Sequence, residues 1–429
     1  MEDATRMRSD TAPSAPDAEA VHVAAGDARA VLAAMLAPAI AFDVARAAAL
    51  GEAGWAALDR LAAQHRLRPL LAHERTERGA DWPVPAAIDA AWRAAQRQAA
   101  MRSVQMMRSL VRASAVLAGA GIAHAALKGA TLAWTHYPHP ALRRMRDLDL
   151  LVEPARALEA YRLLQDAGFG VAEGFSTPPE YSLAHEKHFA PLVDAVFGVA
   201  LELHYRCTDA GEGVLPLRDA GPLLARATTA TIGGAAIPVL APTDTLLHLI
   251  VHAVYDHSFD IGPLLLTDIA HLARGAAIDW AAFWDMADAG GWRRSAALCL
   301  ALAERAHGAL NIATPDCAPL AVPPDLGDDV FQLMLCDAEG VREMRVAIEQ
   351  QTLRTARATL SFYWRRIVAP RHVVARWAGV ERDHPALPGY YVLRAIALMR
   401  LQVQWRRNRH PDADDNAARL GRVERWIAG

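Results

Sequence analysis

One short segment restricts the fold of this chain more than any other feature. Residues 147–152 are Asp-Leu-Asp-Leu-Leu-Val, an apolar stretch with carboxylates at alternate positions. Because side chains alternate across a β-strand, this pattern predicts a strand with Asp147 and Asp149 on one face and leucines on the other. The strand rise would place the two carboxylates about 6–7 Å apart. Such a pair suits Mg²⁺ that is bridged to nucleotide phosphates.

The flanks of this segment are strongly apolar, which favours an interior strand over an edge strand. Buried charges without partners are costly, so the two acids need a cation or hydrogen-bond donors. A second strand is predicted over residues 199–205, with Glu202 and His204 on the same face. Lys128 and Gly129 follow a third predicted strand, residues 122–127. We therefore expect the three acids to meet near this Lys-Gly turn.

Helical and strand patterns alternate along the chain in an order that predicts an α+β fold, mostly helical overall. We expect a disordered tail over 1–27, an N-terminal helical region over 28–120, a sheet-containing core over 121–210 and a C-terminal helical region over 211–429. Within the core the predicted elements are strands at 122–127, 147–152, 186–193 and 199–205, with helices at 129–134 and 155–167. A small β excursion is expected at 232–240.

Composition restricts the function classes. The 429 residues contain 45 Lys+Arg and 48 Asp+Glu, a formal charge of −3, so no basic field suggests nucleic acid as a partner. The chain has no apolar run of about 18–20 residues and no signal-peptide pattern at its N-terminus, so we expect a cytoplasmic protein with no membrane association. The Ala- and Arg-rich composition is typical of a GC-rich bacterial genome. The four widely spaced cysteines indicate reduced, buried thiols.

The histidines leave alternatives open. His204 is placed to contact a metal-bound water, a phosphate or the acceptor, or else to serve a structural role. His248 and His252 lie one helical turn apart, a spacing compatible with zinc. No glutamate lies between them in the metalloprotease arrangement and no third ligand is evident, so helix packing or a place on the acceptor side is the favoured interpretation.

Several of these residues resemble the motifs of a known family. The matching residues are Lys128-Gly129, Tyr137, Arg143, Asp147-x-Asp149-x-Leu151-Val152 and Leu201-Glu202-Leu203-His204, followed by Pro242, Asp244, Leu247, His248, His252, Asp268 and Asp279-Trp280. In this pattern the chain is similar to the uncharacterised nucleotidyltransferase family of the DNA polymerase β-like nucleotidyltransferase superfamily. The resemblance covers roughly residues 120–300 and implies a polymerase β-like mixed-sheet core between helical regions.

The resemblance implies a reaction. A nucleoside monophosphate would pass from an NTP such as ATP to an acceptor hydroxyl, with release of pyrophosphate. Asp147 and Asp149 would hold two Mg²⁺ ions against the triphosphate, and Glu202 would hold the catalytic metal and take part in deprotonating the acceptor. The Lys128-Gly129 turn would let the backbone approach phosphate closely.

The chain also departs from the superfamily pattern. The usual Gly-Ser turn is replaced by Gly129-Ala130, which has no hydroxyl, and the gap to Asp147 is long. Lys128 and Arg143 are our candidates to replace the missing phosphate contacts, because guanidinium pairs bidentately with phosphate. Arg146 directly precedes Asp147, so we expect it to point to the opposite face.

The acceptor stays open at this stage. A small molecule, a peptide natural product and a protein side chain all carry suitable hydroxyls, and relatives in this family often accompany peptide-modification genes, which makes a peptide reasonable. Two alternatives belong to other classes. One is a non-catalytic peptide- or nucleotide-binding protein that retains the fold, and the other is glycosyl transfer from a nucleotide sugar.

Overall fold

The structure is a computed structural model that describes residues 18–78, 81–175, 177–208, 217, 219–313, 321–336, 369, 371–381, 383–407 and 413–429. The helical pattern expected for residues 337–368 therefore lies outside the described residues. Within them, no helix combines the length and the apolar character needed to cross a membrane.

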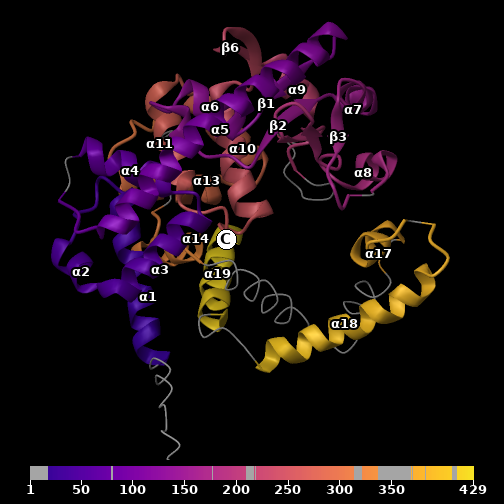
Figure 1. Cartoon of the computed structure of the whole chain (residues 1–429). Coiled ribbons are helices and arrows are strands. Elements are labelled where there is room, and N and C mark those ends of the chain that lie inside the picture. The colour runs from indigo at the N-terminus through magenta and orange to yellow at the C-terminus, as the bar shows by residue number, and fades with distance from the viewer. Residues whose placement is uncertain are drawn as a thin grey trace, which may run out of the picture.

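A seven-stranded sheet lies at the centre of the fold (Figure 1). The strand order across it is β3-β4-β5-β2-β1-β7-β6. Parallel pairs (β2–β5 and β1–β7) occur beside antiparallel ones, so the sheet is mixed and the predicted α+β class is confirmed. The strands are β1 (His124–Ala126), β2 (Asp147–Val152), β3 (Phe169–Val171), β4 (Leu192–Asp194), β5 (Val199–His204), β6 (Thr228–Ile232) and β7 (Ala235–Val239).

Along the sequence, helices come before, between and after the strands of the sheet. Five precede it: α1 (Ala18–Leu36), α2 (Val44–Ala49), α3 (Gly51–Gln64), α4 (Arg68–Glu77) and α5 (Ala86–Gly119). Between strands lie α6 (Gly129–Thr135), α7 (Ala157–Asp166), α8 (Pro179–His185) and α9 (Ala220–Ala225). After the sheet come α10 (Pro242–Val251), a π-helix (His252–Asp256), α11 (Leu264–Gly275), α12 (Trp280–Ala289), α13 (Arg293–His307), α14 (Pro324–Met334), α17 (Arg371–Ala378), α18 (Leu387–Arg407) and α19 (Ala413–Ala428).

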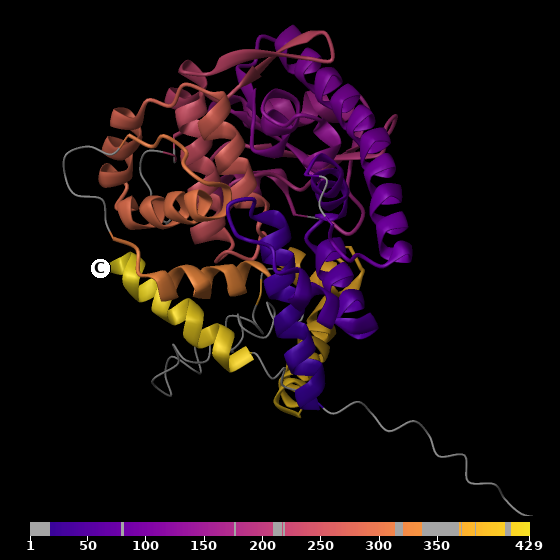
Figure 2. The same cartoon turned by 90° about the vertical axis from the view of Figure 1, so that its left-hand side faces the viewer.

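The two faces of the sheet contact different parts of the chain. One face packs against α5 and α7 through alternate leucines of β2 and β5, which form one hydrophobic core. Leu151, on the opposite face, belongs to a second core made mainly of the helices before and after the sheet. Figure 2 shows the long helix α5 on one side of the sheet and the helices of residues 242–307 on the other. Because Asp147 and Asp149 alternate with the first set of leucines, they face the second side.

The predicted tail is partly wrong. Helix α1 begins at Ala18, so residues 18–27 are helical where disorder was expected. The physical reason is that alanine has the highest helix propensity and that no proline interrupts residues 18–36. Residues 1–17 lie outside the described residues.

The end of the predicted core, residue 210, is too early. β6 and β7 form a hairpin around Gly233-Gly234, and β7 joins the main sheet by pairing Ala126 with Val239. The turn was visible as a Gly-Gly pair, but the parallel pairing with β1 joins residues more than a hundred positions apart. Local patterns therefore show the hairpin and do not show its membership of the sheet.

The region between α7 and β5 also differs from expectation. Residues 186–193 were expected to form one strand, yet β4 covers only Leu192–Asp194 and pairs with a strand β3 that was not predicted. Pro191 lacks the N–H that a continuous ladder needs. Upstream of it, His188 makes only an isolated bridge to His204. That bridge brings residues 187–188 to the end of β5.

Candidate active site

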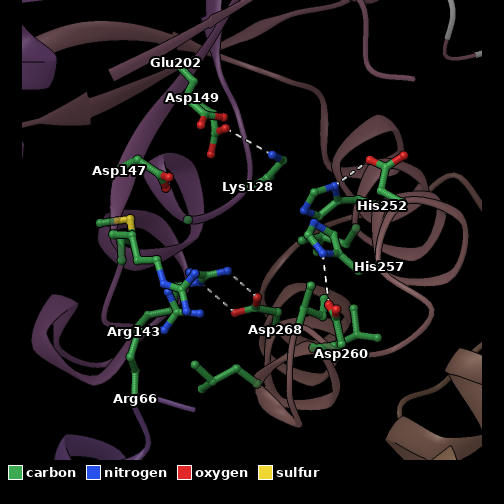
Figure 3. A pocket seen from close by; sticks show the side chains of 18 of the residues that line it. Arg66, Lys128, Arg143, Asp147, Asp149, Glu202, His252, His257, Asp260 and Asp268 are labelled. Carbon is green, nitrogen blue, oxygen red and sulfur yellow. Dashed lines mark hydrogen bonds and ion pairs between the residues drawn. The ribbon is translucent and has the colours of Figure 1, made fainter. Parts of the chain in front are cut away.

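A cavity of about 480 Å³ opens between the acid-bearing face of the sheet and the segment from the end of α10 to α11 (Figure 3). Its sheet wall comes from β2, β5, the turn at Lys128-Gly129 and the loop 143–146. Its helical wall comes from residues 249–268, and Arg66 closes one side from the turn between α3 and α4. The cavity thus draws on segments from residue 66 to residue 268.

Strand register brings the three acids of the sequence prediction to this cavity. β2 and β5 are parallel neighbours, with Asp149 opposite Glu202 and Leu151 opposite His204. Asp147 lies two residues before Asp149 and so shares its face. All three carboxylates line the cavity, as Figure 3 shows. Side-chain atoms of Asp149, Glu202 and His204 lie within 4.8 Å of one another, close enough to hold one metal ion.

Asp149 is buried and already has cationic neighbours. Its Oδ1 accepts hydrogen bonds from Lys128 Nζ at 3.0 Å and from His204 Nε2 at 2.8 Å. Burial alone would raise the pKa of Asp149, but Lys128 and His204 outweigh it and hold that pKa well below its usual range. Burial lowers and Asp149 raises the pKa of Lys128, and the net shift is upward. Both groups are therefore charged at neutral pH.

Asp147 has the opposite character. Burial, with repulsion from Asp149 and Glu202, raises the pKa of Asp147 to about 6. In the described part of the chain its carboxylate has neither a salt bridge nor a side-chain hydrogen bond. Uncompensated negative charge beside two further carboxylates favours binding of a cation, and oxygen donors are the ligands that Mg²⁺ prefers. The donor set of this wall therefore fits Mg²⁺.

Glu202 is held more loosely than Asp149. Its Oε2 lies 3.5 Å from His204 Nε2 and 3.7 Å from His188 Nε2. Burial raises the pKa of Glu202, whereas His204 and His188 lower it, and the net shift is downward. Glu202 is thus ionised without a tight ion pair, so its carboxylate can still coordinate a metal ion.

The Lys-Gly turn has a backbone that few residues tolerate. Lys128 has φ of 48°, in the left-handed region, and Gly129 begins α6 directly after it. A Cβ at Gly129 would lie 2.7 Å from both Arg143 Nη1 and Met145 Sδ. Only glycine fits this close approach. The turn points the Lys128 side chain back over β2 to Asp149.

Arg143 lines the cavity, but most of its donors are engaged. Its guanidinium pairs bidentately with Asp268 of α11, at 3.1 Å from Nε and 2.8 Å from Nη2, and the hydroxyl of Tyr137 donates to Asp268 at 2.7 Å. Tyr137, Arg143 and Asp268 were among the residues that carried the family resemblance. The structure shows that they join the loop after α6 to the helical wall. A contact from Arg143 to phosphate stays a prediction.

Three other arginines surround the cavity opening. Arg66, Arg144 and Arg146 all line it, and in the described ranges none has an ion-pair partner. Burial, with repulsion mainly from Arg146 and Arg143, lowers the pKa of Arg66 to about 10. The expectation that Arg146 faces away from Asp147 stays a prediction, because β2 begins only at Asp147 and Arg146 lines both this cavity and a second one beside α5. Arg66 lies in a turn far upstream, where no local pattern indicated it.

The helical wall carries histidines paired with aspartates. His252 Nδ1 is 2.8 Å from Asp256 Oδ2, and Lys187 Nζ donates to the same oxygen. His257 Nδ1 is 3.0 Å from Asp260 Oδ1. The ring centroids of His248 and His252 lie 5.9 Å apart. Among the described residues, the group able to hold a metal ion is Asp149, Glu202 and His204, and it does not include this pair. Sequence reasoning noted Lys187 beside the strand of Glu202, but it missed Asp256 and the contact that joins both to His252.

Comparison with known proteins agrees with this geometry. No curated protein matches the chain. Residues 51–308, more than half of the chain, match a family described as an uncharacterised nucleotidyltransferase. The matched range includes Arg66, the sheet with its three acids and the helical wall. The chain belongs to this uncharacterised nucleotidyltransferase family.

Proposed function

We propose that the chain is a Mg²⁺-dependent nucleotidyltransferase that moves a nucleoside monophosphate from an NTP to an acceptor hydroxyl and releases pyrophosphate. The observation that carries this proposal is the meeting of Asp147, Asp149 and Glu202 on one cavity wall, beside arginines that have no carboxylate partner among the residues that the structure describes. A purely structural cluster would pair its charges directly. Here negative and positive groups face one open space.

Asp147, Asp149 and Glu202 would hold the metal ions, with His204 orienting Asp149. Two Mg²⁺ ions at such a site neutralise phosphate charge and clamp the attacking and leaving oxygens of an in-line displacement. Asp147 suits this role because its carboxylate has no side-chain partner among the described residues, and because burial and the neighbouring carboxylates raise its pKa, a shift that a bound cation would reverse. His204 keeps Asp149 fixed through a 2.8 Å hydrogen bond.

The triphosphate would bind along the cationic side of the cavity. Arg66, Arg144 and Arg146 line it there without an ion-pair partner in the described segments, and charge-assisted hydrogen bonds from arginine to phosphate are among the strongest in proteins. Gly129 lets the side chains of Arg143 and Met145 pack closely against the turn that carries Lys128. Arg143 holds the surrounding loop in place through Asp268.

In the transfer, the acceptor oxygen forms a bond to the α-phosphorus while the bond to the bridging oxygen of the β-phosphate breaks. The acceptor would enter from the helical wall, since the sheet wall and the arginines are taken by metal and phosphate. A hydroxyl on a small molecule, a peptide or a protein satisfies this geometry. The peptide alternative rests on the family resemblance.

Pyrophosphate release tests the proposal. The full chain is incubated with Mg²⁺ and each of the four NTPs, first with water as the acceptor and then with candidate acceptors followed by mass spectrometry. We expect release in the wild type and a loss of release in Asp149→Asn. A non-catalytic binding protein would release nothing with any NTP, and a glycosyltransferase would act instead on UDP-sugars offered in parallel.

A further inference from the structure

The helical wall contains a backbone distortion next to the cavity. After α10 the chain forms a π-helix over His252–Asp256, and π-turns of this kind are often found at functional sites. Ser258 and Phe259 follow with φ of 48° and 68°. Two consecutive non-glycine residues in the left-handed region cost about 1–3 kcal/mol each, so the surrounding packing must hold them there. Phe259, only 1% exposed, anchors this turn.

Within this segment the imidazole of His252 is oriented by a carboxylate. Asp256 lies one turn after His252 and bonds its Nδ1, while Lys187 holds the same carboxylate oxygen from the loop beside β5. Burial raises the pKa of Asp256, but His252 and Lys187 outweigh it and hold that pKa well below its usual range. An ionised carboxylate can only accept, so the proton of His252 lies on Nδ1. Nε2 therefore carries the lone pair.

Nε2 of His252 is available to the cavity. Within the ranges that the structure describes, Nε2 has no hydrogen-bond partner, although the ring lines the cavity. Figure 3 shows His252 across the cavity from Asp147, Asp149 and Glu202, whereas the Lys128 ammonium points toward Asp149. The ring of His257 packs edge-on against His252 with centroids 4.4 Å apart, which limits its rotation.

We propose that His252 is the general base that takes the proton from the acceptor hydroxyl, with Asp256 and Lys187 as its positioning residues. This inference rests on the proposed function and names the residue that activates the acceptor. It departs from the role that the family resemblance implied for Glu202. Glu202 lies on the metal-binding wall, whereas His252 lies on the wall left for the acceptor.

The chemical step is balanced. The acceptor O–H bond breaks and its proton passes to Nε2 of His252. The freed oxygen pair forms the bond to the α-phosphorus, the bond to the bridging oxygen breaks, and pyrophosphate leaves with that electron pair. Solvent then removes the proton from His252.

The unliganded site keeps His252 neutral, as a base must be before it acts. Burial and the nearby positive charge of Lys128 lower the pKa of His252 to about 3, while Asp256 acts to raise it and His257 to lower it. Phosphate bound beside Lys128 offsets that positive charge. We therefore expect nucleotide binding to increase the basicity of His252 at the step where it is needed.

The experiment uses the full chain, Mg²⁺, an NTP and water as the acceptor, so that no natural acceptor is required. His252→Ala should lower pyrophosphate release by about 10²–10⁴-fold, the usual contribution of a general base, and added imidazole should restore part of it. Equilibrium binding of labelled NTP should stay unchanged. Asp256→Asn should give a smaller loss without rescue. His185→Ala, an exposed histidine on α8, controls for any general effect of imidazole.

The outcomes separate two kinds of failure. If Asp149→Asn releases pyrophosphate like the wild type, the proposed function fails. If Asp149→Asn is inactive but His252→Ala is fully active, only the role of His252 is overturned. His252→Gln guards against misfolding: it should melt like the wild type yet lose the same activity. An active His252→Gln, or a His252→Ala that imidazole does not rescue, also overturns the inference.

Discussion

The sheet wall and the helical wall of the cavity carry different chemistry for a physical reason. On the sheet wall, the strand register brings three carboxylates together, and their summed negative charge is larger than the positive charge of the side chains bonded to them. On the helical wall, Asp256 and Asp260 are paired with His252 and His257, whose rings line the cavity, and Asp268 is paired with Arg143. Under the proposed function, the sheet wall would bind a cation and the helical wall would accept a proton. The two sets of groups therefore lie on different elements of the fold, strands on one wall and helices on the other.

The largest effect is expected on the sheet wall. Glu202→Gln removes one negative charge from the metal site with no change in shape, so kcat should fall roughly a thousandfold. The free energy of unfolding should hardly change, because the nearest basic atoms, the ring nitrogens of His204 and His188, lie 3.5 and 3.7 Å away. Pyrophosphate release and urea unfolding measure the two quantities. A variant that is active and destabilised would assign Glu202 to structure.

The second prediction concerns the link between the walls. Asp268→Ala leaves the buried Arg143 guanidinium and the Tyr137 hydroxyl without their acceptor, which should cost about 3–5 kcal/mol of unfolding free energy. Asp328→Ala breaks an exposed ion pair with Arg305 and serves as the matched control, with a cost of about 0–1 kcal/mol. Equal costs for the two variants would show that the walls are held by other contacts.

The third prediction tests the close packing at the Lys-Gly turn. In Gly129→Ala the new methyl group would meet Met145 and Arg143, and overpacking of this kind costs about 1–3 kcal/mol. Gly119→Ala is the control, because that glycine ends α5 with open space around it. Thermal melting compares them. Unchanged melting of Gly129→Ala would mean that the turn relaxes.

A smaller effect is expected at the cavity opening. Arg144→Gln removes an exposed guanidinium that has no ion-pair partner in the described segments, so the variant should fold normally. The KM for NTP should rise about tenfold with kcat retained, since one charge-assisted hydrogen bond is lost. Arg102→Gln is the control, because Arg102 donates instead to the Gly198 carbonyl. A KM that rises equally in both variants would indicate only a general loss of positive charge.

The smallest effect concerns acid stability of the helical half. Burial, together with Arg274 and His271, lowers the pKa of His307 to about 4. In the unfolded state His307 takes up a proton near pH 6.5, whereas in the folded state it does so only near pH 4. The contribution of His307 to the free energy of unfolding therefore falls as the pH falls between those values. Urea unfolding between pH 7 and pH 4.5 should show a shallower decline in His307→Gln than in the wild type. Parallel declines would exclude His307 as the cause.

The sheet wall could be predicted because its signals are local. Alternation in residues 147–152 fixed the face of Asp147 and Asp149, and the same pattern around Glu202 placed it on a second strand. β2 matches the expected residues 147–152 because, apart from the two acids, each of its residues is apolar and buried. The pattern does not show that these two strands are parallel neighbours, which only the structure reveals.

The helical wall could not be predicted in this way. Asp256 and Lys187 meet through packing between a π-helix and a loop, and neither segment has a sequence period that indicates such a contact. Arg66 reaches the cavity through a left-handed turn between two helices. The β6–β7 hairpin joins the sheet where Val239 pairs with Ala126, two residues that lie far apart in the sequence. Each of these depends on long-range placement, which local patterns do not encode.

The ion pair between Lys128 and Asp149 has a consequence for how the protein matures. Because an internal ammonium group and His204 already balance the buried carboxylate, the polypeptide can reach its final shape before any divalent ion arrives. We therefore expect chelators to abolish its activity without unfolding it, unlike small zinc domains, which unfold when their metal is removed. The ion would be loaded late and could be exchanged at every turnover.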